Sequence, residues 1–164
     1  MCQWENARVA ETPAIEIGSP AGVEAFEAYY ALRWRLLRAP FGAPKGSERD
    51  DHEEHADHVM VRDGSGRLLG VGRVHMHDQE EARIRYMAVE EGYRRRGIGR
   101  AIAERLEALA SSHGAGRIVL DARKEFVGFY RALGYAAEGP GPTKFGTLEH
   151  VRMSKRLSGA HWGR

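Results

Sequence analysis

The sequence predicts an α/β fold built on a mixed β-sheet, and three observations support that fold class. Strand-like and helical segments alternate along the chain. Gly64-Ser65-Gly66 lies between two strand-like runs, which is typical of an antiparallel hairpin. A glycine- and arginine-rich turn at residues 92–100 joins a strand-like run to a long helical pattern. The sheet is therefore expected to be antiparallel early in the chain and parallel around the central helix.

The first elements are expected to be a short strand and a long helix. Residues 14–17 are predicted as the strand. Ser19-Pro20 predicts the start of the helix, because serine caps helix N-termini and proline fits the first helical position. The helix is expected to reach Arg38, where Ala39-Pro40 ends it. Its apolar stripe is predicted from the helical spacing of Val23, Phe26, Tyr30, Trp34 and Leu37.

The later elements follow from β-prone runs and from helical periodicity. Residues 41–47 are expected to be a loop, and the charge-rich residues 48–58 a short helix or an ordered loop. Gly70 and Gly72, inside a strand, predict a bulge or a close backbone approach. Strands are predicted over 58–63, 68–77, 83–89, 117–121 and 148–155, and helices over 97–113 and 124–133.

Composition places the chain in a broad class. Its 164 residues fit one domain, expected over 13–157, with a disordered lead at 1–12 and a mobile tail at 158–164. The net charge of +2 is too small to argue for a nucleic-acid partner. The single cysteine, Cys2, excludes an internal disulfide framework, which agrees with a reducing cytoplasm. We find no signal peptide and no run apolar enough to span a membrane, so the expected location is cytoplasmic.

The turn at residues 92–100, Gly-Tyr-Arg-Arg-Arg-Gly-Ile-Gly-Arg, carries the strongest functional signal. Glycine allows the backbone to approach a ligand closely. The helix N-terminus presents unpaired N–H groups and a partial positive charge. The arginines add fixed positive charge. The turn is therefore predicted to bind an anion, and a diphosphate-bearing ligand fits it best.

Two common phosphate-binding motifs do not match. The dinucleotide-binding motif would need a third glycine at Ile102, and no P-loop sequence is present. What remains is R-x-x-G-x-G, from Arg94 to Gly99, which resembles the acyl-CoA-binding motif of the GNAT N-acyltransferase superfamily. The segment F-x-x-F-Y-R-A-L-G-Y, Phe126 to Tyr135, resembles the next landmark of the same family. The resemblance covers roughly residues 26–157 and implies a mixed central β-sheet with splayed strands, flanked by helices.

The resemblance also implies an activity and a cofactor site. The chain would be an N-acetyltransferase that moves an acyl group, acetyl in the first instance, from acyl-CoA to a primary amine in a small molecule or a peptide. The amine would attack directly in a ternary complex, without a metal. The pantetheine arm would lie along Met87, Ala88 and Val89. The diphosphate would lie on the turn, contacted by Arg94, Arg95, Arg96, Gly97, Ile98, Gly99 and Arg100.

Two residues are expected to act on the reacting atoms. The Val89 N–H would stabilise the oxyanion formed from the thioester carbonyl. Tyr130 would protonate the departing thiolate. The sequence departs from the family pattern at Arg123, where an asparagine is usual, and at Phe126, where a small residue is usual.

The general base stays open at this stage. The candidates are a water chain or one of several side chains of suitable chemistry: Glu48, Asp50, Glu54, His75, His77 and His150. Of these, His150 matches a histidine of some family members. The acidic residues of 48–57 would suit a cationic acceptor.

Other interpretations compete with this one. The protein could be a non-catalytic acyl-CoA sensor, in which case Tyr130 would have no role in turnover. The arginine turn could be a solvated surface or an RNA-binding patch, although no aromatic residue except Tyr93 interleaves the arginines. His52, His55 and His58 recur every three residues, but no matching ligand cluster exists apart from His75 and His77, so no metal is predicted. A homodimer stays open, because members of this superfamily often dimerise.

Overall fold

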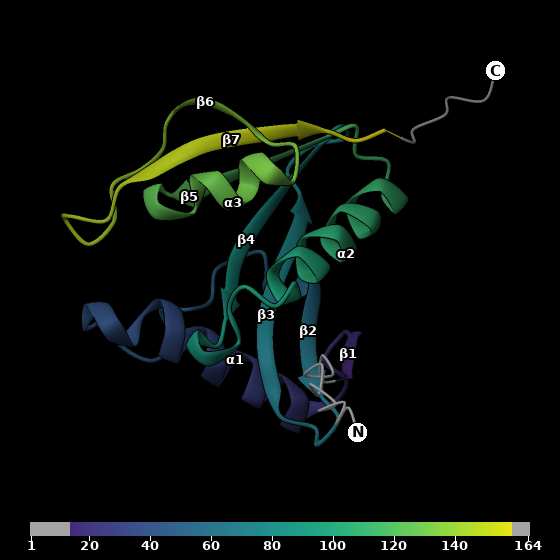
Figure 1. The fold of residues 1–164 in the computed structure, drawn as a ribbon, viewed down its shortest axis with the longest axis vertical. Coiled ribbons are helices and arrows are strands. Elements are labelled where there is room, and N and C mark those ends of the chain that lie inside the picture. The colour runs from purple at the N-terminus through teal and green to yellow at the C-terminus, as the bar shows by residue number, and fades with distance from the viewer. Residues whose placement is uncertain (1–13, 159–164) are drawn as a thin grey trace, which may run out of the picture.

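The computed structural model describes residues 14–158, which build one seven-stranded sheet in the order β1-β2-β3-β4-β5-β7-β6 (Figure 1). All neighbouring strands are antiparallel except β4 and β5, which are parallel. The predicted mixed α/β fold is therefore confirmed. The strands are β1 (Ile15–Gly18), β2 (Asp57–Asp63), β3 (Leu68–Met76), β4 (Glu81–Val89), β5 (Arg117–Arg123), β6 (Ala136–Pro140) and β7 (His150–Arg156). The helices are α1 (Val23–Leu37), α2 (Ile98–Ser112) and α3 (Val127–Ala132), with short 3₁₀ turns η1 (Ala39–Phe41), η2 (Glu53–His55), η3 (Glu91–Tyr93) and η4 (Lys124–Phe126).

Some sequence predictions fall outside this part of the chain. The expected disordered lead at 1–12, with Cys2, and all but the first residue of the expected tail at 158–164 lie outside the described residues. Within residues 14–158, no helix combines the length and the apolar character needed to cross a bilayer.

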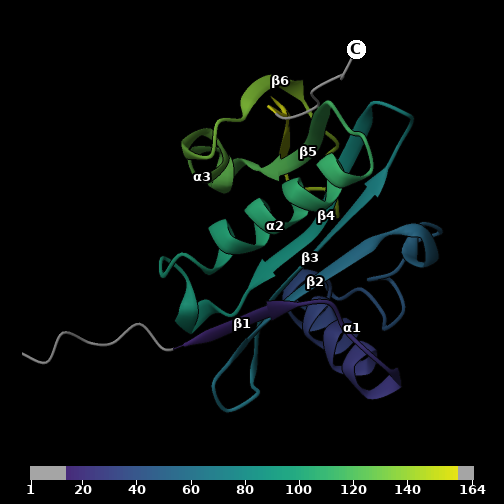
Figure 2. The ribbon, with the colours of Figure 1, turned by 90° about the vertical axis from the view of Figure 1, so that its right-hand side faces the viewer.

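The helices cover opposite faces of the sheet, as Figure 2 shows for α1 and α2. On the α2 side, Ile98, Ile102 and Leu106 pack into the larger core, which α3 also joins through Val127. On the α1 side, a smaller core gathers aromatic and aliphatic side chains: Tyr29, Tyr30, Leu32, Met60 and Val71. The sheet thus separates two apolar layers, and the α1 layer lies over β2, β3 and β4.

Strands β4 and β5 separate from each other halfway along their length. Their pairing ends at Arg83 and Val119, although β4 continues to Val89 and β5 to Arg123. A bulge in β4 lies beyond this point: two β4 residues fit opposite Gly72 of β3, and Tyr86 has a left-handed φ of 57°. A bulge bends its strand and increases the local twist. The splayed strands that the sequence implied are therefore present, and the bulge lies next to the gap.

Helix α1 differs from its prediction at its start and in its buried face. It begins at Val23 after an uncapped Gly22 with φ 83°, three residues beyond the expected Pro20. Val23 is 75% exposed, and the fully buried side chains include Arg33. Hydrophobic periodicity cannot identify a buried arginine, so the predicted stripe was rotated away from the true one.

Strand β6 was missed by the sequence analysis. It contains Gly139 and Pro140, which are disfavoured in strands, and its residues are mostly exposed. Its partner is β7, with which it pairs antiparallel at the edge of the sheet. β6 is a strand because it pairs with β7, and no local sequence signal predicts this pairing.

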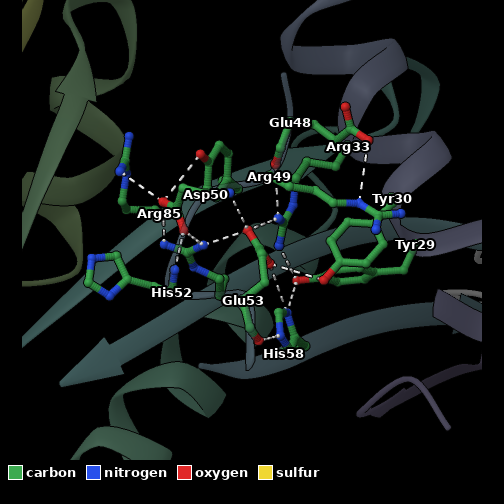
Figure 3. A network of polar contacts seen from close by, with 12 residues as sticks. Tyr29, Tyr30, Arg33, Glu48, Arg49, Asp50, His52, Glu53, His58 and Arg85 are labelled. Carbon is green, nitrogen blue, oxygen red and sulfur yellow. Dashed lines mark hydrogen bonds and ion pairs between the residues drawn. The ribbon is translucent and has the colours of Figure 1, made fainter. Parts of the chain in front are cut away.

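The charge-rich residues 48–58 pack through a buried ion-pair network (Figure 3). Arg33 of α1 and Arg73 of β3 have side chains with no exposed surface. One carboxylate oxygen of Glu53 lies 2.8 Å from Arg33 Nη1 and 2.6 Å from Arg73 Nη1. Asp50 adds contacts of 2.6 and 2.9 Å to the Arg73 guanidinium. The segment is therefore an ordered loop around η2, held because two buried cations need carboxylates.

Aromatic and histidine side chains complete the network. The Tyr29 hydroxyl accepts from Arg33 Nη2 at 2.7 Å and donates to the Gly72 carbonyl at 3.0 Å. His58 contacts this hydroxyl through Nδ1 at 3.0 Å and the Glu53 carbonyl through Nε2 at 2.8 Å. These contacts connect α1, the loop, β2 and β3.

Gly72 leaves no room for a side chain under α2. A Cβ at this position would lie 2.6 Å from Ile102 Cγ2 and 2.9 Å from Leu106 Cδ1. We expect Gly72→Ala to lower the free energy of unfolding by about 1–3 kcal/mol, as overpacking does. Gly18→Ala is the control, because a Cβ there meets no atom within 4 Å. Urea denaturation would measure both, and equal midpoints for the two variants would contradict the prediction.

Glu53 pairs with both buried arginines, and Arg73 also pairs with Asp50. We expect Glu53→Gln to lower the free energy of unfolding by about 3 kcal/mol, because it leaves the buried Arg33 without its counter-ion. Glu54→Gln is the matched control: the neighbouring Glu54 is exposed and should change stability by no more than about 0.5 kcal/mol. The check is the same denaturation experiment, and a Glu53 variant as stable as the Glu54 variant would contradict the assignment.

Candidate active site

A cleft of about 1130 Å³ occupies the gap between β4 and β5. Residues of both faces of the sheet line it, so the cleft reaches from the α2 and α3 side to the α1 side. It brings together most of the predicted site residues: Met87, Ala88, Val89, Arg94, Arg95, Gly97, Gly99, Arg100 and Tyr130. Two predicted cofactor residues lie outside the lining. Ile98 is buried in the core, and the Arg96 guanidinium lies 5.3 Å from the Tyr93 ring.

The turn before α2 has the backbone of an anion site. Arg95 and Gly97 have left-handed φ angles of 62° and 81°, and α2 starts immediately afterwards. Within the described part of the chain, no group accepts a hydrogen bond from the backbone N–H groups of residues 95–100. Such donors at a helix N-terminus attract negative charge. Gly99 is also small for a packing reason, since a Cβ there would lie 3.2 Å from Phe129 Cζ.

The backbone of Val89 is oriented toward the cleft. The Glu90 N–H donates to the Leu69 carbonyl at 2.8 Å, which makes these two residues a hydrogen-bonded pair of the ladder. The preceding pair, Val89 with Gly70, is therefore a non-hydrogen-bonded pair in the antiparallel alternation. Its N–H and C=O groups point away from β3, and Arg94 Nε donates to the Val89 carbonyl at 3.4 Å. The Val89 N–H thus lies on the side where β5 is missing.

The Tyr130 hydroxyl lies against β4. The hydroxyl donates to the Met87 sulfur, a weak acceptor, at 3.6 Å. The Tyr130 ring packs edge-on against Phe129 and Tyr135. Burial raises the pKa of Tyr130 well above its usual range, with a smaller opposing effect of Arg123. The hydroxyl therefore stays protonated at neutral pH, as a proton donor must.

None of the three acidic candidates for the base lines the cleft. The buried Glu48 accepts the Gly46 N–H at 2.7 Å. Burial alone would raise the pKa of Asp50, but hydrogen bonds from Arg73 and the His52 N–H hold it well below its usual range. Glu54 is exposed on η2. Of these three carboxylates, Asp50 pairs with a buried arginine, and Glu48 holds the backbone of its own loop.

The three histidine candidates do line the cleft, in different states. His75 stacks on His52 at 4.1 Å, and its Nδ1 lies 3.4 Å from Arg73 Nη2. Burial, with the neighbouring His52 and Arg73, lowers the pKa of His75 to about 4. His77 is exposed at the β3–β4 turn, at the far end of β3 from Gly70, which pairs with Val89. His75 is thus engaged by a cation, and His77 is remote from the thioester position.

His150 has the arrangement of a base. Its Nδ1 lies 2.9 Å from the Pro142 carbonyl and 3.1 Å from the Leu148 carbonyl. Both partners are acceptors, so Nδ1 carries the proton and Nε2 carries the lone pair. Burial, and secondly the charge of Lys144, lowers the pKa of His150 below its usual value. His150 pairs with Arg123 at the end of β5.

Two residues of the network and the cleft were not predicted from the sequence. Glu53 is the central carboxylate of the network. It could not be singled out from the sequence, because its neighbours in the chain are also charged. Lys144 lines the cleft beside His150 from the loop between β6 and β7. Burial, and after it the positive charges of Arg85 and Arg38, lower the pKa of Lys144 to about 8. No sequence signal points to it, since only the β6–β7 hairpin brings it to the cleft.

Two histidines of the charge-rich segment, His52 and His58, contact different residues. His52 stacks on His75, and His58 is held by Tyr29 and Glu53. Across residues 14–158, no three histidine, cysteine or acidic side chains gather in a way that could hold a metal ion.

Comparison with known proteins assigns the family. Residues 26–135 match the acetyltransferase (GNAT) family. The chain is 30% identical to a Bacillus subtilis protein named as the N-acetyltransferase YjcF, over 79% of this chain and 90% of that one. A GNAT-family acetyltransferase from Staphylococcus aureus Mu50 has a similar fold, with a TM-score of 0.72, 16% identity and coverage of 88% and 100% of the two chains. An aminoglycoside 6'-N-acetyltransferase complexed with coenzyme A gives a TM-score of 0.71, 17% identity and coverage of 87% and 96%. The fold, the cleft and the family match agree, and the chain belongs to the GNAT family of acetyltransferases.

Proposed function

We propose that this acetyltransferase moves an acyl group, acetyl in the first instance, from acyl-CoA to a primary amine by direct attack in a ternary complex. One observation carries the proposal: the gap between β4 and β5 joins an anion-binding turn, the Val89 N–H and a protonated Tyr130 in a single cleft. The location in the cytoplasm and a homodimer stay predictions from the sequence.

The cleft fits coenzyme A along its length. The unpaired N–H groups of residues 95–100, with Arg94, Arg95 and Arg100, would hold the diphosphate. The pantetheine amides would take the place of the missing β5 partner along Met87–Val89, because unpaired strand groups at a gap are ready to bind an extended ligand. A similar fold has been solved with coenzyme A bound, in the aminoglycoside acetyltransferase.

The proposed reaction needs no covalent enzyme intermediate. The amine nitrogen forms a bond to the thioester carbon, and the carbonyl oxygen becomes an oxyanion that the Val89 N–H stabilises. When the carbon–sulfur bond breaks, the thiolate takes the proton of the Tyr130 hydroxyl. The nitrogen gives up its proton to a base, and solvent returns a proton to Tyr130. Each step uses a group that lines the cleft.

We assign the base to His150 among the six candidates. It lines the cleft, its Nε2 has the lone pair, and no described residue donates a hydrogen bond to that nitrogen. Its lowered pKa keeps it neutral at physiological pH, so it is ready to accept a proton.

The role of Tyr130 is tested by Tyr130→Phe. We expect kcat to fall by about 10²–10⁴-fold, the range for loss of a general acid, with unchanged affinity for CoA. The measurements are thiol release with a panel of amines and isothermal titration of CoA. Tyr135→Phe is the control, because Tyr135 is buried nearby but its hydroxyl donates to Glu107, at 3.1 Å. A wild type that binds CoA but acetylates no amine would favour the non-catalytic sensor.

The role of His150 is tested by the pH dependence of kcat/KM. For the wild type we expect kcat/KM to show an acid limb below about pH 6.5, where the imidazole becomes protonated, because the pKa of His150 is lowered. His150→Gln should lower the rate about 10²-fold and abolish this acid limb. His77→Gln, which changes an exposed histidine of the same cleft, should leave the limb in place. An acid limb that persists in His150→Gln would rule out the assignment.

A further inference from the structure

The α1 side of the cleft carries a cluster of cations from distant parts of the chain. We call Arg38, Arg85, Arg123 and Lys144 the acceptor-side cluster. Arg38 follows α1, Arg85 lies on β4, Arg123 ends β5, and Lys144 lies between β6 and β7. All four line the cleft. On β5, Arg123 shares its side of the sheet with Asp121, while Leu120 and Ala122 point into the α2 core.

The carboxylates near the cluster do not neutralise it. Among the described residues, no carboxylate pairs with Lys144 or Arg38, and the Arg38 side chain donates only to the carbonyls of Ser47 and Leu37. Arg123 has one carboxylate at 3.9 Å, from Glu125, which is 65% exposed. Arg85 contacts Asp50 at 3.1 Å, but Asp50 also pairs with Arg73.

Asp121 is the remaining acidic group on this face. Its two oxygens accept from Arg152 at 3.0 and 3.2 Å, so its charge is already matched. Glu125 is exposed and Asp50 is shared with Arg73, so neither neutralises the cluster. The cluster therefore keeps an excess of positive charge in a partly buried site.

Aromatic rings hold the arginines of the cluster in position. The Arg38 guanidinium lies 5.4 Å from the Tyr86 ring and 5.5 Å from the Phe145 ring. Arg123 lies 5.4 Å from the Phe41 ring, which stacks on Phe145 at 4.7 Å. The stack joins η1 to the β6–β7 loop, so both sides of this wall are fixed together. Cations over ring faces are preorganised for an anion.

Like charges in a partly buried site are unfavourable for folding. The pKa of Lys144 is lowered for this reason. Burial is the largest cause, and repulsion from Arg85 and Arg38 follows. Groups of this kind are concentrated where a ligand supplies the missing charge. The diphosphate of CoA has its own proposed site, the N–H groups of the turn before α2, although Arg94 of that turn also acts on Arg123.

We propose that the acceptor amine also carries an anionic group, and that Lys144, Arg123 and Arg38 bind it. This inference rests on the proposed acyl transfer and names the acceptor class. A carboxylate or a phosphate shares the required chemistry, since arginine binds either through two parallel hydrogen bonds. The anion would anchor the acceptor on the wall that also holds His150, the proposed base. The earlier expectation of a cationic acceptor is thereby replaced, because Asp50 and Glu53 are committed to arginines.

The first test measures anion binding without turnover. Glutarate, and inorganic phosphate in parallel, are titrated calorimetrically into protein saturated with CoA, which occupies the diphosphate turn. We expect Lys144→Met to weaken binding of the preferred anion about tenfold or more, as for loss of a charged hydrogen-bond donor. The control, Arg105→Gln, removes a positive charge from an exposed position of α2 and should bind as the wild type does. No binding, or equal weakening in both variants, would overturn the proposal.

The second test uses matched acceptors. kcat/KM is compared for 4-aminobutyrate and its amide, and for phosphoethanolamine and ethanolamine, with putrescine as a cationic amine. We expect at least one anionic member to exceed its neutral partner about tenfold, and Lys144→Met to remove the difference through KM. Neutral or cationic amines used equally well would overturn the proposal.

The proposed acyl transfer and the proposed acceptor class can fail separately. If CoA does not bind, the proposed transferase function fails, and titration of glutarate into CoA-free protein still decides the cluster. If CoA binds and amines are acetylated without regard to their charge, only the acceptor class is wrong. Lys144→Met should also raise the melting temperature slightly, since it removes an unpaired charge, and a folded variant makes any loss of binding specific.

Discussion

The site depends on the loss of pairing between β4 and β5. Parallel strands normally exchange hydrogen bonds along their whole length, but here the exchange ends at Arg83 and Val119. Backbone groups beyond that point have lost their partner, and buried backbone groups need one. The bulge at Tyr86 lies next to the opening, and α2 packs closely over Gly72 behind it. The gap lets a ligand pass between the two faces of one sheet, so a donor bound on one face can meet an acceptor bound on the other.

The buried charges on the α1 side support this gap from one edge. Arg33 and Arg73 are fully buried, and their compensation by Glu53 and Asp50 fixes the loop that precedes β2. Removing charges from water is expensive, so such a network persists only when its members are well matched. Asp50 would be a poor base, because the paired Arg73 stabilises its ionised form. The acidic segment 48–57, which the sequence predicted to face the acceptor, therefore has a structural role.

The cleft is positive at both of its ends, for different physical reasons. At the α2 end, backbone N–H groups of residues 95–100 and the helix N-terminus supply the field. At the α1 end, side chains such as Lys144 and Arg123 supply it. Between them lie Tyr130 and Met87, in apolar surroundings that keep the phenol protonated. Two anionic ligands could thus be bound with their reactive ends meeting in a drier middle.

From the sequence, the order of most elements could be predicted and a glycine- and arginine-rich turn before a helix could be located, because both depend on local signals: periodicity, glycine placement and charge near a helix start. The roles of Tyr130 and Val89 came from the resemblance to the GNAT family and stay predictions. The sequence could not determine the face of α1, where the buried Arg33 breaks the apolar pattern, or β6, whose strand character comes from β7. The proposal of His150 as the base, rather than Glu48 or Asp50, and the cluster around Lys144 both rest on the tertiary structure. The reason is physical: which charges neutralise one another depends on distances between residues that lie far apart in the chain.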